Sequence, residues 1–444
     1  MESEEYHPDV DLRHPYLTRQ IIAYIGNKRR LLPFLFRALQ RIYGNTIPSG
    51  LSFLDLFAGS GVVSRLAKFL GFAVWSNDWE PYAYTLGRAY VETQASDITT
   101  LFGSQVQFEQ LLSYLNTLSD PPLEEQYFAR YYAPREEDPF QADYRTERLF
   151  YTRQNALQID RIRNEIDRLF PPGLPSLAPP SPTSAALFPP KSADRLTQGG
   201  MGDLGTWGGQ GERGESKERC RHVLIALLLY EAATHTNTSG VFKAYHKGFG
   251  GHGKDALHRI LQPILLEPPP LIDSLYPCHV FCKEASALMT ELSGKSFDVA
   301  YLDPPYNQHQ YGSNYHLLNT LTLWDKPPIC QELDPKGRLK DKAGIRKDWK
   351  RTRSAYCYRQ SAAPAFYQLL AQIDAEHILI SYSTDGIIPF EILMDICSSQ
   401  GSVRLLTNEY VTYRGGRQSN QRKDHNVEFL LWISQRRGKS SPTR

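Results

Sequence analysis

One short segment of the chain constrains the fold more than any other, because it joins a strand to a rigid turn. An apolar run, residues 299–302, indicates a buried strand, and it leads directly into the tetrapeptide Asp303-Pro304-Pro305-Tyr306. Proline fixes φ and has no N–H, so such a turn holds a carboxylate, a backbone carbonyl and an aromatic ring in one geometry. The structural alternative is a proline turn that only ends a strand.

This arrangement suits the methylation of an exocyclic amino group. The lone pair of an aromatic amine such as adenine N6 is delocalised into the ring, so a catalyst has to hold both N–H bonds and turn the lone pair outward. Asp303 and the Pro304 carbonyl are two suitable acceptors, and Tyr306 would stack on an extruded base. We therefore expect the tetrapeptide to bind and orient a nucleobase.

A second motif offers a place for a methyl donor. Residues 51–57 have the apolar pattern of a strand, the turn Ala58-Gly59-Ser60-Gly61 follows, and residues 62–70 have helical spacing. Glycines at such a turn let the backbone approach a ligand, and the helix start presents free N–H groups. Residues 73–78 indicate a second strand ending in Asp78, which can accept hydrogen bonds from ribose hydroxyls. The turn lacks the three-glycine dinucleotide fingerprint, which argues against a nicotinamide-dependent enzyme.

A third motif, Tyr24-Ile25-Gly26-Asn27-Lys28, precedes both. Together with Phe57-Ala58-Gly59-Ser60-Gly61 and Asp303-Pro304-Pro305-Tyr306, and in this order, it resembles the Dam-like (alpha-group) adenine-N6 DNA methyltransferases, which use S-adenosylmethionine. The resemblance covers residues 20–92 and 275–434. Three motifs in the family's order are far more specific than any one of them.

The resemblance implies roles for individual residues. Asp303, Pro304, Pro305 and Tyr306 are expected to bind the target base, with direct in-line transfer that requires no metal. The expected donor-binding residues are Tyr24, Gly26, Lys28, Asp55, Phe57, Ala58, Gly59, Gly61, Asp78 and Glu284. Among them, Asp55 is expected to hold the methionine amino group, Asp78 the ribose and Glu284 the donor's adenine, where Ser286 or a backbone group is the alternative.

The alternation of strands and helices predicts an α/β fold, a mostly parallel, doubly wound sheet with helices on both faces and an antiparallel pair of strands at its end. Parallel strands are expected around Phe53, Val74, Val280, Val299 and Leu379, and the antiparallel pair over residues 405–413 and 427–433. Ligands are expected at the carboxyl ends of the parallel strands, where the glycine turn and the tetrapeptide both fall.

At 444 residues the chain exceeds a usual single domain. We expect a catalytic domain in two parts, residues 20–94 and 276–434, with a largely helical DNA-recognition insertion at residues 95–275. Helical spacing is found at residues 101–118, 154–169 and 221–234 of the insertion. The proline- and glycine-rich stretch 171–218 is expected to be flexible.

Basic residues cluster locally, although the formal net charge is only +2. One cluster lies between Asp341 and Arg353, where a solvated helix face explains the charges as well as phosphate contact does. A second cluster in the loop between the last two strands consists of Arg414, Arg417, Arg422 and Lys423.

Residues 237–248 resemble a segment that forms a hairpin at the DNA surface in Dam-like enzymes. Lys243, His246 and Lys247 are therefore candidates for phosphate or base contact, and Asn307, next to the tetrapeptide, is a further candidate for substrate binding. A purely structural hairpin is the alternative.

The six cysteines form no Cys-x-x-Cys pair, and no histidine pair completes a zinc site. The longest apolar run, residues 223–230, is too short to span a bilayer, and nothing resembles a secretory signal. We expect a reduced, cytoplasmic protein without a metal or a membrane anchor.

The leading hypothesis is a site-specific adenine-N6 DNA methyltransferase that flips its target out of double-stranded DNA, with a cognate restriction endonuclease as a possible partner. The enzymatic alternatives are methylation of adenine in structured RNA or of cytosine N4. A nucleic-acid-binding protein that has lost transfer is the non-enzymatic alternative, against which the intact motifs argue. The sequence indicates neither the target site nor the oligomeric state.

Overall fold

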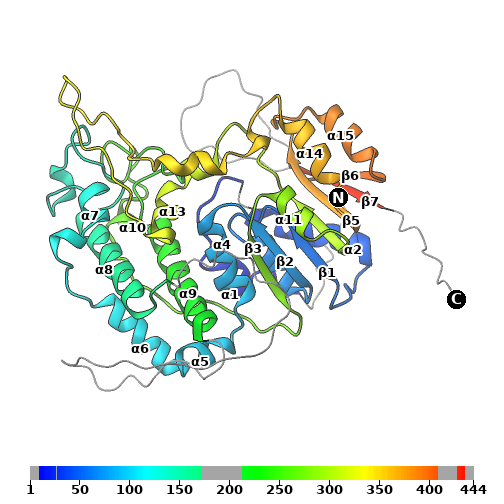
Figure 1. Cartoon of the computed structure of the whole chain (residues 1–444), viewed down its shortest axis with the longest axis horizontal. Helices are drawn as coiled ribbons and strands as arrows, with labels where there is room; N and C mark the ends of the chain where they lie inside the picture. Colours follow the sequence, from blue (N-terminus) through cyan, green and yellow to red (C-terminus); the bar gives the residue numbers. More distant parts are fainter. Residues whose placement is uncertain (1–9, 27, 173–212, 409–427, 436–444) are drawn as a thin grey trace, which may run out of the picture.

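The computed structural model describes residues 10–26, 28–172, 213–408 and 428–435, and its centre is a seven-stranded sheet (Figure 1). The strand order is β3-β2-β1-β4-β5-β7-β6. The first five strands are parallel, and β7 lies antiparallel between β5 and β6. The strand bounds are β1 Ser52–Asp55, β2 Ala73–Asp78, β3 Cys278–Cys282, β4 Phe297–Leu302, β5 Ala375–Ser383, β6 Ser402–Asn408 and β7 Glu428–Ser434. The predicted α/β class, with its parallel sheet and terminal antiparallel pair, is confirmed.

The sheet is covered on both faces, because successive side chains of a strand point to opposite sides. On one face, Phe53 and Val299 pack with α1 (Pro15–Thr18), α2 (Leu32–Tyr43) and α3 (Val62–Phe69). On the other face, Leu54 and Ala300 pack with α11 (Ala285–Glu291), α14 (Ala362–Leu370) and α15 (Phe390–Ser398). The short strands therefore belong to a doubly wound layer whose strands are buried on both sides.

The strand predictions differ from the structure mainly at their ends. The strand predicted over residues 51–57 is confined to Ser52–Asp55, and that predicted over residues 405–413 begins earlier, at Ser402. Residues 409–427, with the four loop cations Arg414, Arg417, Arg422 and Lys423, lie outside the described residues. So does most of the stretch 171–218 that was expected to be flexible.

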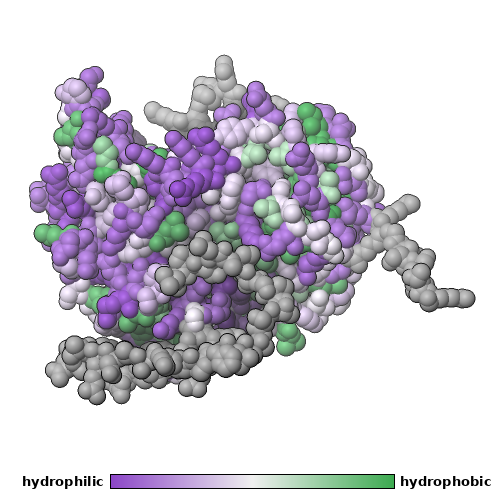
Figure 2. Space-filling model, in the orientation of Figure 1, coloured by the Kyte–Doolittle hydropathy of each residue, from purple (hydrophilic) through white to green (hydrophobic). Residues whose placement is uncertain are grey.

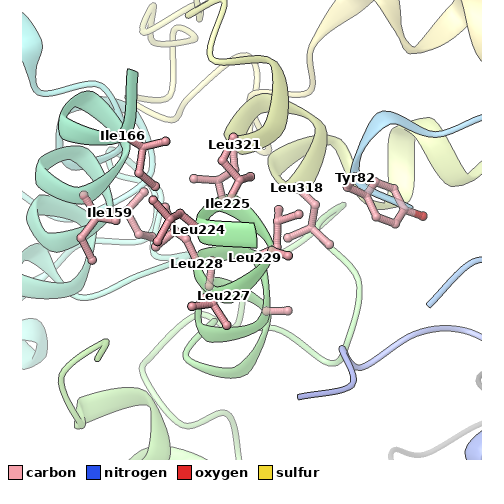
Figure 3. Close-up of a cluster of buried hydrophobic side chains, with 14 of the residues drawn as sticks. Tyr82, Ile159, Ile166, Leu224, Ile225, Leu227, Leu228, Leu229, Leu318 and Leu321 are labelled. Atoms are coloured by element: carbon pink, nitrogen blue, oxygen red, sulfur yellow. The ribbon is translucent and has the colours of Figure 1, made fainter. Parts of the chain in front are cut away.

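The region between β2 and β3 is helical, as expected. Its principal helices are α4 (Pro81–Gly87), α5 (Asp97–Phe102), α6 (Gln105–Asn116), α7 (Phe128–Tyr131), α8 (Arg153–Leu169), α9 (Arg213–Thr234) and α10 (Leu257–Leu261). Helix α9 lies at the centre, and its leucines pack against α8 on one side and against α13 (His316–Leu323) on the other (Figure 3). Residues 315–345, which follow the tetrapeptide, therefore share the hydrophobic core of the helical region.

Two local predictions in this region were wrong. The single helix predicted over residues 101–118 is two helices, because Gly103 takes a φ of 85° and the Ser104 side chain caps α6 by accepting a hydrogen bond from the Gln107 amide. The hairpin predicted over residues 237–248 has no strands. Its backbone closes instead around Asn237, whose carbonyl accepts from the His246 amide and whose side chain donates to the His246 carbonyl.

Among the described residues, no helix is both long and apolar enough to cross a membrane.

Candidate active site

The two motif turns lie at the same edge of the sheet. Strands β1 and β4 are parallel neighbours, with Asp55 in register with Tyr301. The glycine turn follows β1 and the Asp-Pro-Pro-Tyr tetrapeptide follows β4, so both emerge at the carboxyl ends of adjacent strands. This edge is where ligands bind in open parallel sheets.

The glycine turn depends on its two glycines for different reasons. Gly59 has a φ of 54°, and its amide donates a 2.8 Å hydrogen bond to Asp78 Oδ2 at the end of β2. A Cβ added at Gly59 would lie 2.8 Å from the Tyr24 ring, so a larger residue there would have to displace that ring. Gly61 has a φ of 75° and forms the left-handed residue from which α3 begins.

Tyr24 is held over the glycine turn by other aromatic rings. Its ring stacks on Tyr315, with centroids 4.7 Å apart, and on Tyr311, with centroids 5.3 Å apart. The Tyr315 hydroxyl also accepts a 2.7 Å hydrogen bond from the Ile25 amide. The opening motif is thus attached to α12 (Tyr311–Asn314) and to the residue after it, which follow the tetrapeptide in the chain.

The tetrapeptide carboxylate lies in a group of three charges. Lys28 Nζ lies 3.2 Å from Asp303 Oδ1 and 3.3 Å from Glu428 Oε2, at the start of β7. Burial raises the pKa of Asp303 to about 6, while the Lys28 cation opposes the shift and Glu428 adds to it. Asp303 Oδ1 is therefore the oxygen of the ion pair with Lys28, whereas no described residue donates a hydrogen bond to Oδ2.

Asp55 is a second buried carboxylate with a free acceptor. Its Oδ2 accepts a 2.6 Å hydrogen bond from the Ser64 hydroxyl, whereas no residue that the structure describes donates a hydrogen bond to Oδ1. Burial raises the pKa of Asp55 to about 7, against the effect of the Ser64 hydrogen bond. A positively charged donor group would satisfy both the free oxygen and the buried charge.

The other tetrapeptide residues lie around Asp303. Pro304 is buried, and no described residue donates a hydrogen bond to its carbonyl oxygen. The Tyr306 ring lies edge-on to Tyr382 and 5.7 Å from Lys28 Nζ. Asn307 Oδ1 accepts a hydrogen bond from the His309 amide, which directs the chain towards α12.

Two adjoining cavities bring most of the predicted donor-site residues together, and Tyr24, Phe57 and Asp303 line both. The larger one, of about 200 Å³, is also lined by Asp78, Glu284 and Pro305. The smaller one is also lined by Gly26, Lys28, Asp55, Ala58 and Gly59. A groove of about 460 Å³ in the helical region is larger, but it contains none of the three motifs. The convergence of the motifs, and not the volume, identifies the site.

Two acids of the larger cavity already have partners in the protein. Asp78 Oδ1 and Oδ2 accept from the amides of Glu80 and Gly59. Glu284 caps α11 by accepting from the Ala287 amide. Each carboxylate oxygen has a further lone pair, so both acids can still accept from a ligand.

The remaining predicted residues do not line these cavities. Gly61, Pro304, Tyr306 and Asn307 belong to the two turns behind or beside them. The segment after α9 carries Lys243, His246 and Lys247. This segment is fixed to the tetrapeptide side of the molecule, because the Phe242 amide donates to the Asn314 carbonyl and the Phe242 carbonyl contacts His316 Nε2. Lys243 and Lys247 are exposed there.

Sequence reasoning missed several residues that contribute to the site. Glu80 is a buried acid of the larger cavity, where burial raises its pKa to about 7 and its carboxylate accepts from Asn319. Glu428 and Tyr356 also belong to this group. An acid two residues after Asp78 is a weak signal for Glu80, whereas neither Glu428 nor Tyr356 stands in a motif.

A parallel sheet that presents a glycine turn and an Asp-Pro-Pro-Tyr turn to one cavity defines a methyltransferase that acts on an amino group. Comparison with known proteins identifies the family. The model of the D12 class N6 adenine-specific DNA methyltransferases matches residues 24–169 and 216–337, which is more than half of the chain. The chain belongs to this family.

Individual relatives agree with this assignment. The type II methyltransferase M.NlaIII of Neisseria lactamica is 28% identical over 406 residues, which cover 91% of this chain and 96% of the relative. The modification methylase LlaI of Lactococcus lactis subsp. lactis is 29% identical over 403 residues, and the type II methyltransferase M.FokI of Planomicrobium okeanokoites is 25% identical over 416 residues. The chain spans about half the length of these last two, 51% and 52%.

The protein is thus a site-specific, adenine-specific N6 DNA methyltransferase, as the leading hypothesis predicted. Its family membership sets aside structured RNA and cytosine N4 as the principal substrate.

Proposed function

We propose that the methyl donor is S-adenosylmethionine, bound in the two adjoining cavities beside the glycine turn. The residues that line the two cavities support this proposal. A buried acid with a free oxygen suits an ammonium group, a close glycine backbone suits a sugar, and aromatic walls suit an adenine ring. When bound, this cofactor supplies a methyl group that is already activated on a positive sulfonium.

Each part of the cavity has a proposed task. Asp55 Oδ1 accepts from the amino group of the methionine moiety, near Gly26, Phe57, Ala58 and Gly59. Asp78 accepts from the ribose hydroxyls, and Glu284 from the adenine at the outer end. Gly61 shapes the turn that leads into α3, and Tyr24 forms a wall of the site through its aromatic stack.

The target adenine is proposed to enter next to Asp303. Asp303 and the Pro304 carbonyl accept the two N6 hydrogens and so turn the nitrogen lone pair outward, while Tyr306 stacks on the base and Pro305 holds the turn. The acceptors at Asp303 Oδ2 and at the Pro304 carbonyl, to which no described residue donates a hydrogen bond, support this proposal. Positioning and electrostatics then account for catalysis, since the methyl group needs no further activation.

Lys28 and Glu428 are proposed to keep Asp303 in its working state. The Lys28 cation favours the ionised carboxylate, and Glu428 fixes the position of Lys28 from the opposite side. Lys28 would therefore act on the catalytic carboxylate as well as near the methionine end of the donor.

The DNA substrate is proposed to be double-stranded, with the target base flipped into the cavity. Lys243, His246 and Lys247 contact phosphates or bases beside it, and the Asn307 amide contacts the flipped nucleotide. We further propose the division expected from the sequence, with catalytic parts at residues 20–94 and 276–434 and a recognition insertion at residues 95–275, to whose core residues 315–345 contribute.

We also infer a setting for the enzyme. Its relatives are named as a type II methyltransferase and a modification methylase, so a restriction endonuclease that cuts the same unmethylated site is the proposed partner. The six free cysteines suit the reducing cytoplasm, which is the proposed location.

The test is to incubate the protein with radiolabelled S-adenosylmethionine and separate pools of duplex DNA, single-stranded DNA and structured RNA, and then to identify the labelled nucleoside. We expect N6-methyladenine in duplex DNA, and none with the variant Asp303→Ala. Label mainly in RNA or in single-stranded DNA would contradict the proposed substrate. Label that persists with Asp303→Ala would contradict the proposed site.

A further inference from the structure

A short segment between α13 and α14, residues 346–357, forms one wall of the larger cavity; we call it the basic strap. Thr352, Arg353, Ser354, Ala355 and Tyr356 line the cavity that Asp303 also lines. In Figure 1 the strap is the yellow segment that crosses from the helical half of the molecule to the sheet half. Whatever binds in this cavity therefore contacts the strap.

The strap is held firmly against the cavity. The Gln310 side chain accepts from the Ser354 amide at 2.9 Å and donates to the Ser354 carbonyl at 3.3 Å. Gly312 fits closely beneath it, because a Cβ there would lie 2.7 Å from Thr352 Oγ1. At its start, buried Arg346 pairs with Asp325 and Asp348.

The outer face of the strap carries cations of a different kind. Lys347, Lys350 and Arg351 are exposed, as is Arg353, which also lines the cavity, and none of the four forms a salt bridge with an acid among the described residues. By contrast, Arg338 and Lys340 on the preceding loop are neutralised by Asp334 and Glu332. The positive charge is therefore left free over the cavity wall. Figure 2 shows this surface as strongly hydrophilic.

A second basic element lies next to the strap. Lys243 follows Phe242, whose amide donates to the Asn314 carbonyl at the end of α12, and Gly312 of the same short helix packs against Thr352 of the strap. Cys357 of the strap contacts the His309 carbonyl through its Sγ at 3.4 Å, three residues after Tyr306. The free cations and the tetrapeptide thus surround one opening.

We propose that the outer face of the basic strap binds the phosphates of the DNA strand next to the flipped adenine, while its inner face contacts the methyl donor. The inference rests on the proposed donor site. Since one short, firmly held segment would contact both ligands, its position affects both binding sites. We expect DNA to raise the affinity for the donor, and linkage then requires that the donor raise the affinity for DNA by the same factor.

The first test measures the salt dependence of duplex binding by fluorescence anisotropy over a range of KCl concentrations. The double variant Lys350→Ala/Arg351→Ala is compared with Arg37→Ala/Arg41→Ala, which removes the same charge from the exposed side of α2. The plot of log K against log salt has a negative slope, and each lost phosphate contact makes it less steep by about 0.9. We therefore expect the slope to become less steep by about two in the strap variant and to stay unchanged in the control. Equal slopes in both variants would overturn the proposal.

The second test measures the affinity of S-adenosylhomocysteine by calorimetry, with and without duplex. In the wild type we expect tighter binding with DNA. In the strap variant we expect the DNA-free affinity to be retained and the gain to be lost, whereas a gain retained in full would overturn the coupling. If S-adenosylhomocysteine fails to bind even the wild type, the proposed donor site is wrong, while the salt slopes still decide whether the strap binds DNA.

Discussion

Two regions of the molecule contain a buried carboxylate of similar pKa, but the carboxylates have different surroundings. In the helical region, Asp160 on α8 accepts hydrogen bonds from the amides of Phe128 and Ala129, one on each oxygen. At the carboxyl edge of the sheet, Asp55 Oδ1 has no hydrogen-bond partner among the described residues, and Asp303 pairs through Oδ1 with Lys28 while its Oδ2 receives no hydrogen bond from them. Burial raises the pKa of Asp160 and Asp55 to about 7 and that of Asp303 to about 6.

The comparison shows that a raised pKa alone does not distinguish a structural acid from a functional one, because burial alone produces it. The open acceptors do distinguish them. Asp160 uses both oxygens to cap the start of α7, so it stabilises the fold. Asp55 Oδ1 is a buried acceptor without a described partner, which costs free energy that a ligand could recover, and Asp303 leaves Oδ2 for a ligand while Lys28 holds Oδ1.

The largest effect is expected from removing the carboxylate of Asp303. Asp303→Ala should lower the rate of methyl transfer by about a thousandfold or more, because the acceptor that orients the amino group is lost. Its affinity for S-adenosylhomocysteine and its melting temperature should change little. A near-normal rate would remove Asp303 from the catalytic site and with it the contrast to Asp160.

The next effect concerns donor binding. Asp55→Asn keeps the shape of the side chain but removes the charge proposed to face the methionine amino group. We expect the Kd for S-adenosylhomocysteine, measured by calorimetry, to rise roughly tenfold to a hundredfold, as the loss of a charge-assisted hydrogen bond implies. A matched Ser64→Ala variant, which removes only the hydroxyl that orients Asp55, should show a smaller increase.

Asp160→Ala should affect stability instead of chemistry. The buried amides of Phe128 and Ala129 lose their acceptor, at about 1–3 kcal/mol for each amide. Urea unfolding should show this decrease in the free energy of unfolding, while the rate constant of the folded enzyme stays close to that of the wild type. A large drop in kcat with unchanged stability would reverse the comparison.

The smallest effect is a pair of opposite shifts in the pH profile. The proposed role of Asp303 as an acceptor needs the ionised carboxylate, so the rate should fall as the pH drops through its pKa of about 6. Lys28 lowers that pKa and Glu428 raises it. Lys28→Met should therefore move the acid limb of kcat to higher pH, and Glu428→Gln to lower pH, each by about one unit.

The Asp55→Asn variant is the control for this pair of variants. Burial raises the pKa of Asp55 to about 7, so the control shows whether the acid limb belongs to Asp55 instead of Asp303. A shift of the acid limb in the same direction for Lys28→Met and Glu428→Gln would show that the limb does not belong to Asp303.

The sequence predicted those parts of the site that depend on neighbouring residues. The strand over residues 73–78 matches β2 at both ends, and the glycine turn and the tetrapeptide both follow buried strands. Alternating burial, turn residues and helix spacing are local signals, so they can be recognised without the fold. The same signals failed at residues 101–118, where one glycine divides a continuous helical pattern, and at residues 237–248, where no ladder forms.

By itself, the sequence determined the α/β class and the order of the three motifs, and it predicted the chemistry of the tetrapeptide, because each element and motif is recognised from a local segment of the chain. Only the tertiary structure decided that Lys28 lies between Asp303 and Glu428, a residue 400 positions away from it. It also decided that the basic strap forms a wall of the larger cavity, and that backbone amides bond both oxygens of Asp160 while Asp303 pairs with a lysine. These are contacts between segments far apart in the chain, and they exist only once the sheet and the helical core bring those segments together.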